Sequence, residues 1–234
     1  VSYTAYYSDP IGRPIAKALY GTNGGASFSR PTTVPARSDT VLVTTTEYTW
    51  GVLNAGELFN RSEIISNVNP RNIATHLRWN SARWLVEVIR EPGGIARTTR
   101  LSYNPEGRRT ERLEVNSATG NQSTKYIYGA TLTDSQIASN RLLRSIIYPD
   151  SSDTNPSGTN QIKFEYNRQG QIIKRTDQAA TVHVLEYDKR GRVIHDRVTA
   201  LGTNVNGAVR RISRTFEPRG LPAKVTSVDN ATVG

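Results

Sequence analysis

The sequence predicts an all-β protein built from repeated antiparallel β-hairpins. A short phrase that suits a hairpin turn recurs along the chain, and segments beside it alternate apolar and polar residues with a period of two. The 234 residues are 36% hydrophobic, and the apolar residues are spread over the whole length. This distribution excludes a disordered polyelectrolyte, and we expect the hairpins to form one strip.

The recurring phrase consists of an aromatic residue, an Asx or acidic residue, two variable residues and glycine, and it occurs four times. Tyr166 and Tyr187 are 21 residues apart, and Tyr103 precedes Tyr166 by 63 residues, three times that spacing. A degenerate copy lies near the start of the chain. The repeat positions are Tyr103, Asn104 and Gly107; Tyr166, Asn167 and Gly170; Tyr187, Asp188, Gly191 and Arg192; Phe216 and Gly220; and Asp9 and Gly12.

Each copy has the chemistry of a three-residue hairpin loop, a type I turn followed by a left-handed residue. An Asx side chain in the first position accepts a hydrogen bond from the backbone two residues on. Glycine in the fourth position adopts a positive φ without a Cβ penalty, so we expect positive φ at all the repeat glycines. Glu217 is the weakest first residue, because its longer side chain fits such a turn poorly.

The flanks of the repeated turns read as strands, because they are rich in β-branched and aromatic residues. We expect strands at 83–90, 161–166, 171–175, 181–187 and 192–198, with strand fragments at 48–51 and 77–80. A second class of turn is expected at 21–25, 116–120, 177–180 and 204–207, and a loop at 150–160. Short helices are expected at 57–65 and 134–143, although 142–148 also reads as a strand.

Repeat quality divides the chain into a degenerate region, 1–100, and a well-formed repeat region, 101–234, within one continuous strip rather than independent domains. The chain begins at Val1 and contains no methionine, so we expect a processed protein or a piece of a longer one. Neither end carries a capping pattern. Because repeats bury their faces against neighbours, we expect open sheet edges that pair with more chain or with another copy.

The chain is strongly basic, with a net charge of +10 and 24 arginines among its 30 basic residues. The arginines are dispersed, which favours a solvated β-surface on which their stems cover apolar area. The alternative is a polyanionic partner such as an acidic glycan. Nucleic acid is not an expected partner, because no basic block occurs, and no apolar run is long enough to span a membrane.

The residues give no reason to expect an enzyme, a metal or a cofactor. Cysteine is absent, which excludes disulfides, cysteine-ligated zinc and thiol nucleophiles. His183 and His195 flank one repeat turn and would face each other across it; as metal ligands they would need Asp188 or Asp196 as well. The simpler interpretation is a pair of exposed strand residues. Acidic residues beside the repeat turns, namely Glu165, Glu186 and Glu217, are placed with a regularity that favours a structural role.

Residues 187–193, Tyr-Asp-Lys-Arg-Gly-Arg-Val, resemble the YD repeat of the RHS protein family, and 126–129 and 147–150 resemble segments between such repeats. The similarity is strongest over 161–230. It implies a strip of β-hairpins that spirals into a hollow shell, as in bacterial RHS proteins, toxin-complex C components and teneurins. It further implies a secreted or cell-surface protein, bacterial in origin, whose partners are neighbouring repeats or further copies, and an encapsulated toxin domain. The repeat aromatics would then stack along the strip.

Several positions depart from the YD pattern. Asparagine replaces aspartate at 104 and 167, Gln171 and Leu221 replace the arginine after glycine, and Ala180 stands where glycine is usual. The self-cleaving Asp-Pro-x-Gly phrase of bacterial RHS cores occurs once, at 9–12, where it reads better as a hairpin turn. Two functions follow: a non-enzymatic shell segment, or a glycan- or polyanion-binding adhesion module or filament subunit that uses exposed Tyr and Arg. Burial of the tyrosine face would distinguish them.

Overall fold

The computed structural model describes residues 2–22, 28–52, 61–149 and 160–233, and within these ranges it contains sixteen strands and no helix. The all-β prediction is confirmed. The strands are β1 (Ser2–Ser8), β2 (Pro14–Thr22), β3 (Val41–Val52), β4 (Arg61–Val68), β5 (Ala74–Trp79), β6 (Leu85–Arg90), β7 (Arg97–Tyr103), β8 (Arg109–Val115), β9 (Gln122–Ala130), β10 (Ser139–Ile147), β11 (Gln161–Tyr166), β12 (Ile172–Thr176), β13 (Val182–Tyr187), β14 (Val193–Ala200), β15 (Arg211–Phe216) and β16 (Pro222–Val228).

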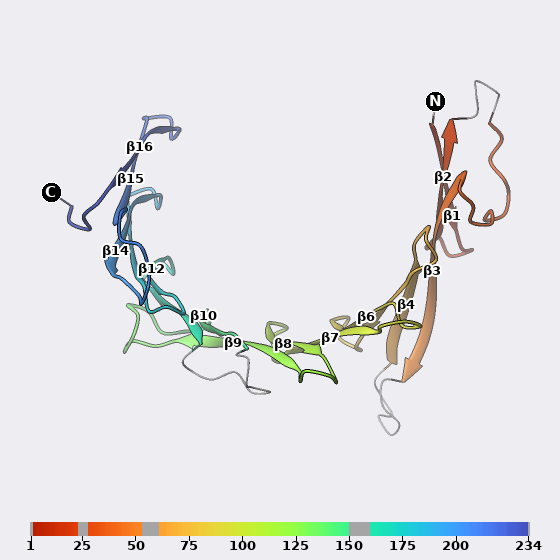
Figure 1. Cartoon of the computed structure of the whole chain (residues 1–234), viewed down its shortest axis with the longest axis horizontal. Coiled ribbons are helices and arrows are strands. Elements are labelled where there is room, and N and C mark those ends of the chain that lie inside the picture. Colours follow the sequence, from red (N-terminus) through yellow and green to blue (C-terminus); the bar gives the residue numbers. More distant parts are fainter. Residues whose placement is uncertain (1, 23–27, 53–60, 150–159, 234) are drawn as a thin grey trace. The chain divides into compact units, whose positions relative to one another are not determined.

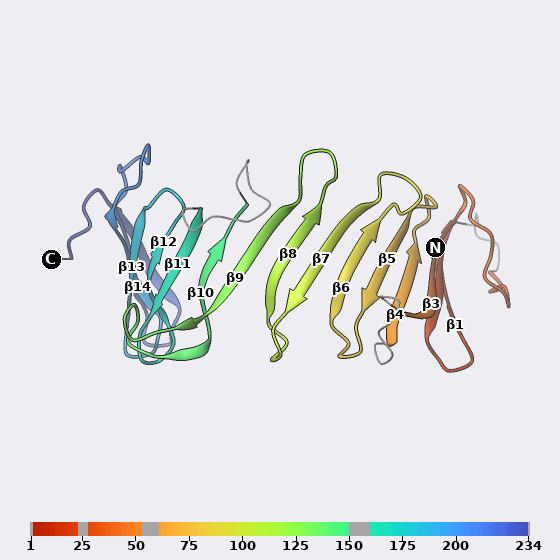
Figure 2. The same cartoon turned by 90° about the horizontal axis from the view of Figure 1, so that it is seen from below.

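The chain forms two compact units, residues 1–121 with β1–β8 and residues 122–234 with β9–β16. Within each unit every strand pairs antiparallel with the strands before and after it in the sequence (Figures 1 and 2). Each unit is therefore a strip of consecutive hairpins. The predicted division into 1–100 and 101–234 rests on repeat quality and stays a prediction.

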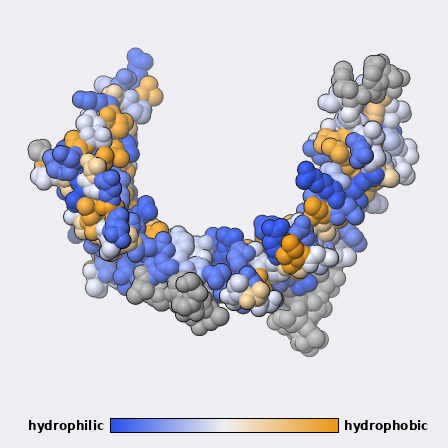
Figure 3. Space-filling view, in the orientation of Figure 1, coloured by the Kyte–Doolittle hydropathy of each residue, from blue (hydrophilic) through white to orange (hydrophobic). Residues whose placement is uncertain are grey.

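A strip of hairpins has a small core, and most described side chains are half-buried. In the first unit a core cluster forms on β1–β3, from Ala5, Tyr7, Ala16, Ala18 and Val43. Elsewhere side chains on neighbouring strands cover one another, which is how an exposed sheet is stabilised. Figure 3 accordingly shows a mainly hydrophilic surface with scattered apolar residues on each unit.

Both helix predictions are wrong where the structure describes them. Residues 139–147 form β10, which pairs with β9 and β11, so the alternative interpretation of 142–148 as a strand is correct. The preceding turn is held by β11, because the Tyr166 N–H donates to Ser135 Oγ (3.0 Å) and the Gln136 N–H donates to the Tyr166 carbonyl (2.7 Å). Residues 61–65 belong to β4, and 57–60 lie outside the described residues.

Candidate functional site

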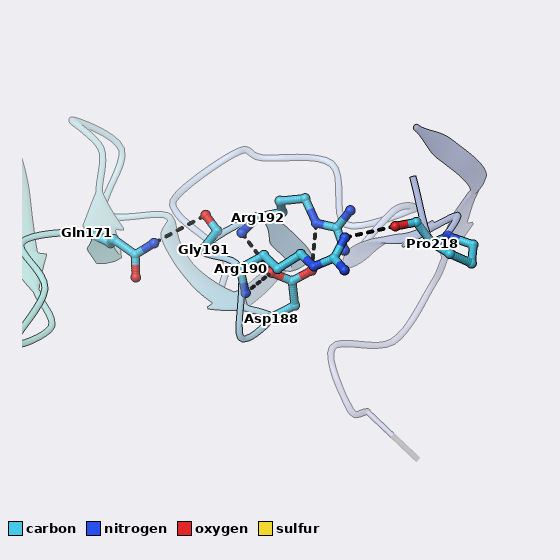
Figure 4. A network of polar contacts seen from close by, with 6 residues as sticks. All are labelled: Gln171, Asp188, Arg190, Gly191, Arg192 and Pro218. Atoms are coloured by element: carbon cyan, nitrogen blue, oxygen red, sulfur yellow. Dashed lines mark hydrogen bonds and ion pairs between the residues drawn. The ribbon is translucent and has the colours of Figure 1, made fainter. Parts of the chain in front are cut away.

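The repeated turn is seen most completely at Asp188–Gly191, between β13 and β14 (Figure 4). The Asp188 N–H donates to the Arg192 carbonyl (2.9 Å), and the Gly191 N–H donates to the Asp188 carbonyl (3.0 Å). Asp188 Oδ1 accepts from the N–H groups of Arg190 (2.9 Å) and Arg192 (3.0 Å). Gly191 has φ +79°, which is the left-handed conformation expected of the fourth residue.

The other predicted copies repeat this geometry. The turns that begin at Asp9, Asn104, Asn167 and Glu217 have the same two backbone hydrogen bonds, at 2.8–3.0 Å. The predicted positive φ is confirmed at their glycines, with +85° at Gly12, +78° at Gly107, +79° at Gly170 and +94° at Gly220. Asp9, Asn104 and Asn167 also accept backbone N–H donors through Oδ1. These five sites, counting Asp188, are therefore one structural element used repeatedly.

Three more copies have a non-glycine residue in the left-handed position. The turns beginning at Asn69, Asn80 and Asp177 have the same backbone bonds, and their fourth residues, Asn72, Arg83 and Ala180, have φ of +62°, +62° and +67°. Assigning 177–180 to a second class of turn was therefore wrong. Sequence reasoning missed the turns at 69–72 and 80–83, and the signal that marks them is asparagine in the first position, whose Oδ1 accepts the N–H of the residue after the turn.

The arginine that follows two of the turns links one hairpin to the next. Arg192 Nε donates to Asp188 Oδ2 (2.7 Å), and its guanidinium lies 4.1 Å from the ring centroid of Phe216, on β15. Arg13 does the same, with Nε 2.6 Å from Asp9 Oδ2 and the guanidinium 4.4 Å from the Tyr48 ring. The aspartate fixes the arginine, and the arginine holds the neighbouring aromatic side chain.

These contacts shift the pKa of both aspartates in the same direction. Hydrogen bonds from the backbone and side chain of Arg192 lower the pKa of Asp188. At Asp9 desolvation acts in the opposite direction, but the side-chain and backbone hydrogen bonds from Arg13 outweigh it, and the pKa is lowered. The carboxylates of both turns are thus stabilised in the ionised form that binds arginine.

Side chains also join successive turns along one edge of the second unit. Gln171 Nε2 donates to the Gly191 carbonyl (3.2 Å), and Arg190 Nη1 donates to the Pro218 carbonyl (3.0 Å), as Figure 4 shows. The turns at 167–170, 188–191 and 217–220 are therefore connected in series.

Each repeat tyrosine bonds to the backbone of the strand before its own. The hydroxyls of Tyr103, Tyr166 and Tyr187 donate to the carbonyls of Leu85 (2.7 Å), Leu143 (2.6 Å) and Ile172 (2.6 Å). Burial raises the pKa of all three phenols. These tyrosines therefore anchor their hairpin to the previous one.

The stacking of repeat aromatics on one another is not found among the described residues. Tyr103 contacts Trp84 instead, with ring centroids 5.4 Å apart, and Phe216 lies under Arg192. The aromatics of the second unit lie on β11, β13 and β15, so a whole strand separates each from the next. Two strand spacings amount to roughly 10 Å, which is too far for ring contact.

The histidines do not face each other. The strand register places His195 opposite Glu186 and His183 opposite Val198. His183 Nδ1 pairs with Asp196 Oδ1 (2.8 Å), and His195 Nδ1 bonds with Ser213 Oγ (2.9 Å). Across the part of the chain that the structure describes, no three histidine, aspartate or glutamate side chains are grouped to hold a metal ion.

Two of the glutamates beside the turns form cross-strand ion pairs. Glu165 pairs with Lys174 (2.8 Å) and Glu186 with Arg197 (2.5 Å). Sequence reasoning missed a third, more buried carboxylate in the first unit. Glu87 is 7% exposed and pairs with Arg78 (2.8 Å) on one neighbouring strand and Arg100 (3.1 Å) on the other. All these charges are used in holding strands together.

Comparison with known proteins supports the fold alone. No protein-family model matches the sequence, and no curated protein matches it. Among solved structures, a chain of the TcdB2-TccC3-Cdc42 crystal structure is similar over 96% of this chain, with a TM-score of 0.58 and 13% sequence identity. This chain covers 11% of the length of that chain. The described residues include no helix with the length and apolar character needed to cross a lipid bilayer.

Proposed function

We propose that this chain is a non-enzymatic structural segment of a β-shell of the RHS/YD type. The observation that carries the proposal is that the repeated side chains are directed at neighbouring hairpins. Tyrosine hydroxyls bond to the preceding strand, and the arginines after two turns contact the aromatic side chain of a following strand. The fold similarity to a chain of the TcdB2-TccC3-Cdc42 structure is consistent with such a wall.

The repeat tyrosines are buried at 166 and half-buried at 103 and 187, and this favours a wall over a binding platform. Tyr166 is 5% exposed, and its hydroxyl is already bonded to the backbone. A ring in this state offers little surface to a ligand, whereas an adhesion site needs exposed aromatic faces. In this proposal the protein is secreted or lies on a bacterial cell surface, and the wall encloses a toxin or supports a surface assembly.

The partners in this proposal are more strands of the same kind, from the same polypeptide or from further copies. On β16, the last strand of the second unit, Val225 is 61% exposed. An edge strand of this kind is a template for further pairing.

Sedimentation velocity over a range of protein concentrations tests the proposal. We expect the chain to self-associate, and Val225→Lys to weaken that association because a charge on an edge strand opposes pairing. Val209→Lys is the matched control, since Val209 is exposed in the loop before β15. A monodisperse monomer at all concentrations would contradict the proposal, as would equal effects of the two substitutions.

The second candidate function is binding of an acidic glycan or another polyanion. It is favoured by the net charge of +10 and by Tyr6, which is largely exposed with Lys17 5.8 Å from its ring centroid. Retention on heparin that falls steeply with salt and weakens in Tyr6→Ala would support it. If Tyr6→Ala leaves the retention unchanged, the binding to heparin would be non-specific charge attraction rather than binding at a site that contains Tyr6.

A further inference from the structure

The second unit contains a pocket of about 360 Å³ that is lined by residues of β9, β10 and β11 and of the loop between β9 and β10. The strand register places Ile127, Ser145 and Lys163 side by side across these strands, and all three line the pocket. Ser145 is 6% exposed and is much smaller than its two neighbours. The hollow therefore arises where a short side chain stands between two long ones.

The loop between β9 and β10 forms a fixed wall of this pocket. Asp134 lines the pocket and pairs with Arg144 (3.0 Å). Two hydrogen bonds described above tie Ser135 and Gln136, the next residues of the loop, to the backbone of Tyr166. A wall held at three points makes the pocket largely preformed, as ligand sites usually are.

The polar groups of the pocket differ in whether they already have partners. Both acids are engaged, Asp134 by Arg144 and Glu165 by Lys174. Among the described residues Lys163 has no ion-pair partner, and the Ser145 hydroxyl has no hydrogen-bond partner. The groups left to meet a ligand are thus a cation and a hydroxyl.

Gln161 also lines the pocket and already has a partner, and the apolar part of the lining comes from Ile127, Ile147 and Phe164. An apolar lining with a few convergent polar groups is the usual composition of a small-molecule site. A sugar suits it less well, because its hydroxyls need free acceptors and both carboxylates here are already paired with cations. The free groups and the lining together match a ligand with a carboxylate and an apolar body.

We propose that this pocket binds a small apolar carboxylate, an aryl or aliphatic acid. Its carboxylate is placed between Lys163 Nζ and the Ser145 hydroxyl, and its body lies against Ile127 and Ile147. The volume is at the lower end of the range of roughly 300–1,000 Å³ for ligand pockets, which suits one ring with a short chain. The proposal is independent of the shell function.

Isothermal titration with 4-phenylbutyrate tests it, with 4-phenylbutyramide and acetate as comparison ligands. We expect saturable binding of the acid and binding about fivefold weaker for the neutral amide, because Lys163 is exposed and such an ion pair contributes little. Acetate, which lacks the apolar body, should not bind measurably. Equal affinity for acid and amide, or no binding of the acid up to about 10 mM, would overturn the proposal.

Two variants and two matched controls locate the site. Ser145→Val fills the hollow and removes the hydroxyl, so binding should be lost, and Lys163→Gln should weaken binding about fivefold. Ser102→Val on β7 and Lys224→Gln on β16 make the same changes elsewhere and should leave binding unchanged. Circular dichroism checks folding; if Ser145→Val does not fold, Lys163→Gln decides. Equal losses in Lys163→Gln and Lys224→Gln would show non-specific attraction and contradict the site.

Discussion

The turn at 80–83, between β5 and β6, and the turn at 188–191, between β13 and β14, have the same backbone bonds but different residues. In each, the first residue donates its N–H to the carbonyl of the residue after the turn, at 2.9 Å. The fourth residue is Arg83 in one and Gly191 in the other, with φ of +62° and +79°. Glycine is thus dispensable, whereas an acceptor side chain is kept in the first position of both.

The residue that follows the turn also differs between the two turns, although it has the same structural role in both. Trp84 follows the first turn and contacts Tyr103 at the end of β7; Arg192 follows the second and lies over Phe216 at the end of β15. Both side chains lie at the start of one strand and contact the aromatic residue at the end of the next strand, which belongs to the following hairpin. The first contact is between two aromatic rings, and the second is between a cation and a ring. The two turns therefore link neighbouring hairpins at the same position but through different side-chain chemistry.

The largest expected difference between the two regions comes from removing these links. Trp84→Ala should lower the free energy of unfolding by about 2 kcal/mol, because a large half-buried ring is lost. Arg192→Ala should cost about 1 kcal/mol, since a partly exposed cation–aromatic contact contributes less. Chemical denaturation measures both. A greater loss of unfolding free energy in Arg192→Ala than in Trp84→Ala would contradict this ranking of the two contacts.

Exchanging the left-handed residues should give effects of opposite sign. Gly191→Ala should cost about 1 kcal/mol, because an alanine is strained at positive φ, and its Cβ would lie 2.9 Å from Gln171 Nε2. Arg83→Gly should gain up to about 1 kcal/mol by relieving the same strain. Thermal melts of the two variants against the parent protein check the signs. If Arg83→Gly destabilises, Arg83 contributes contacts that outweigh its backbone strain.

The smallest expected effect is a difference in acid sensitivity. Asp188 has a folded-state pKa below its ordinary value of 3.8, so the folded state binds its proton more weakly than the unfolded state. Its contribution to stability is present above pH 3.8 and is lost as the pH falls through the folded pKa. Asp188→Asn gives this turn a neutral first residue, like Asn80 in the other turn. It should therefore reduce the dependence of the melting temperature on pH between pH 5 and 2. An unchanged slope would mean that Asp188 does not contribute to it.

Local chemistry made much of the fold predictable. An acceptor in the first position and glycine in the fourth predicted the turns at 104–107, 167–170, 188–191 and 217–220, and period-two alternation predicted the strands beside most of them. The turns at 69–72 and 80–83 were not predicted because neither has glycine in its fourth position, although asparagine, the residue at 72, is a type that tolerates a positive φ. The segment 134–143 was misread because its pairing with β9 and β11 outweighs its local preference.

The sequence alone therefore specifies the all-β class and the repeated hairpin turn, because both depend on residues within a few positions of one another. The contacts between hairpins depend on which strands become neighbours. These contacts join residues 15 to 24 positions apart in the sequence. Examples are the hydrogen bond from Tyr187 to Ile172, the contact of Arg192 with Phe216, and the position of Ser145 between Ile127 and Lys163. Each local pattern sets the register of its own hairpin, but the contacts between hairpins depend on several turns and strands together and on which face of the sheet is buried.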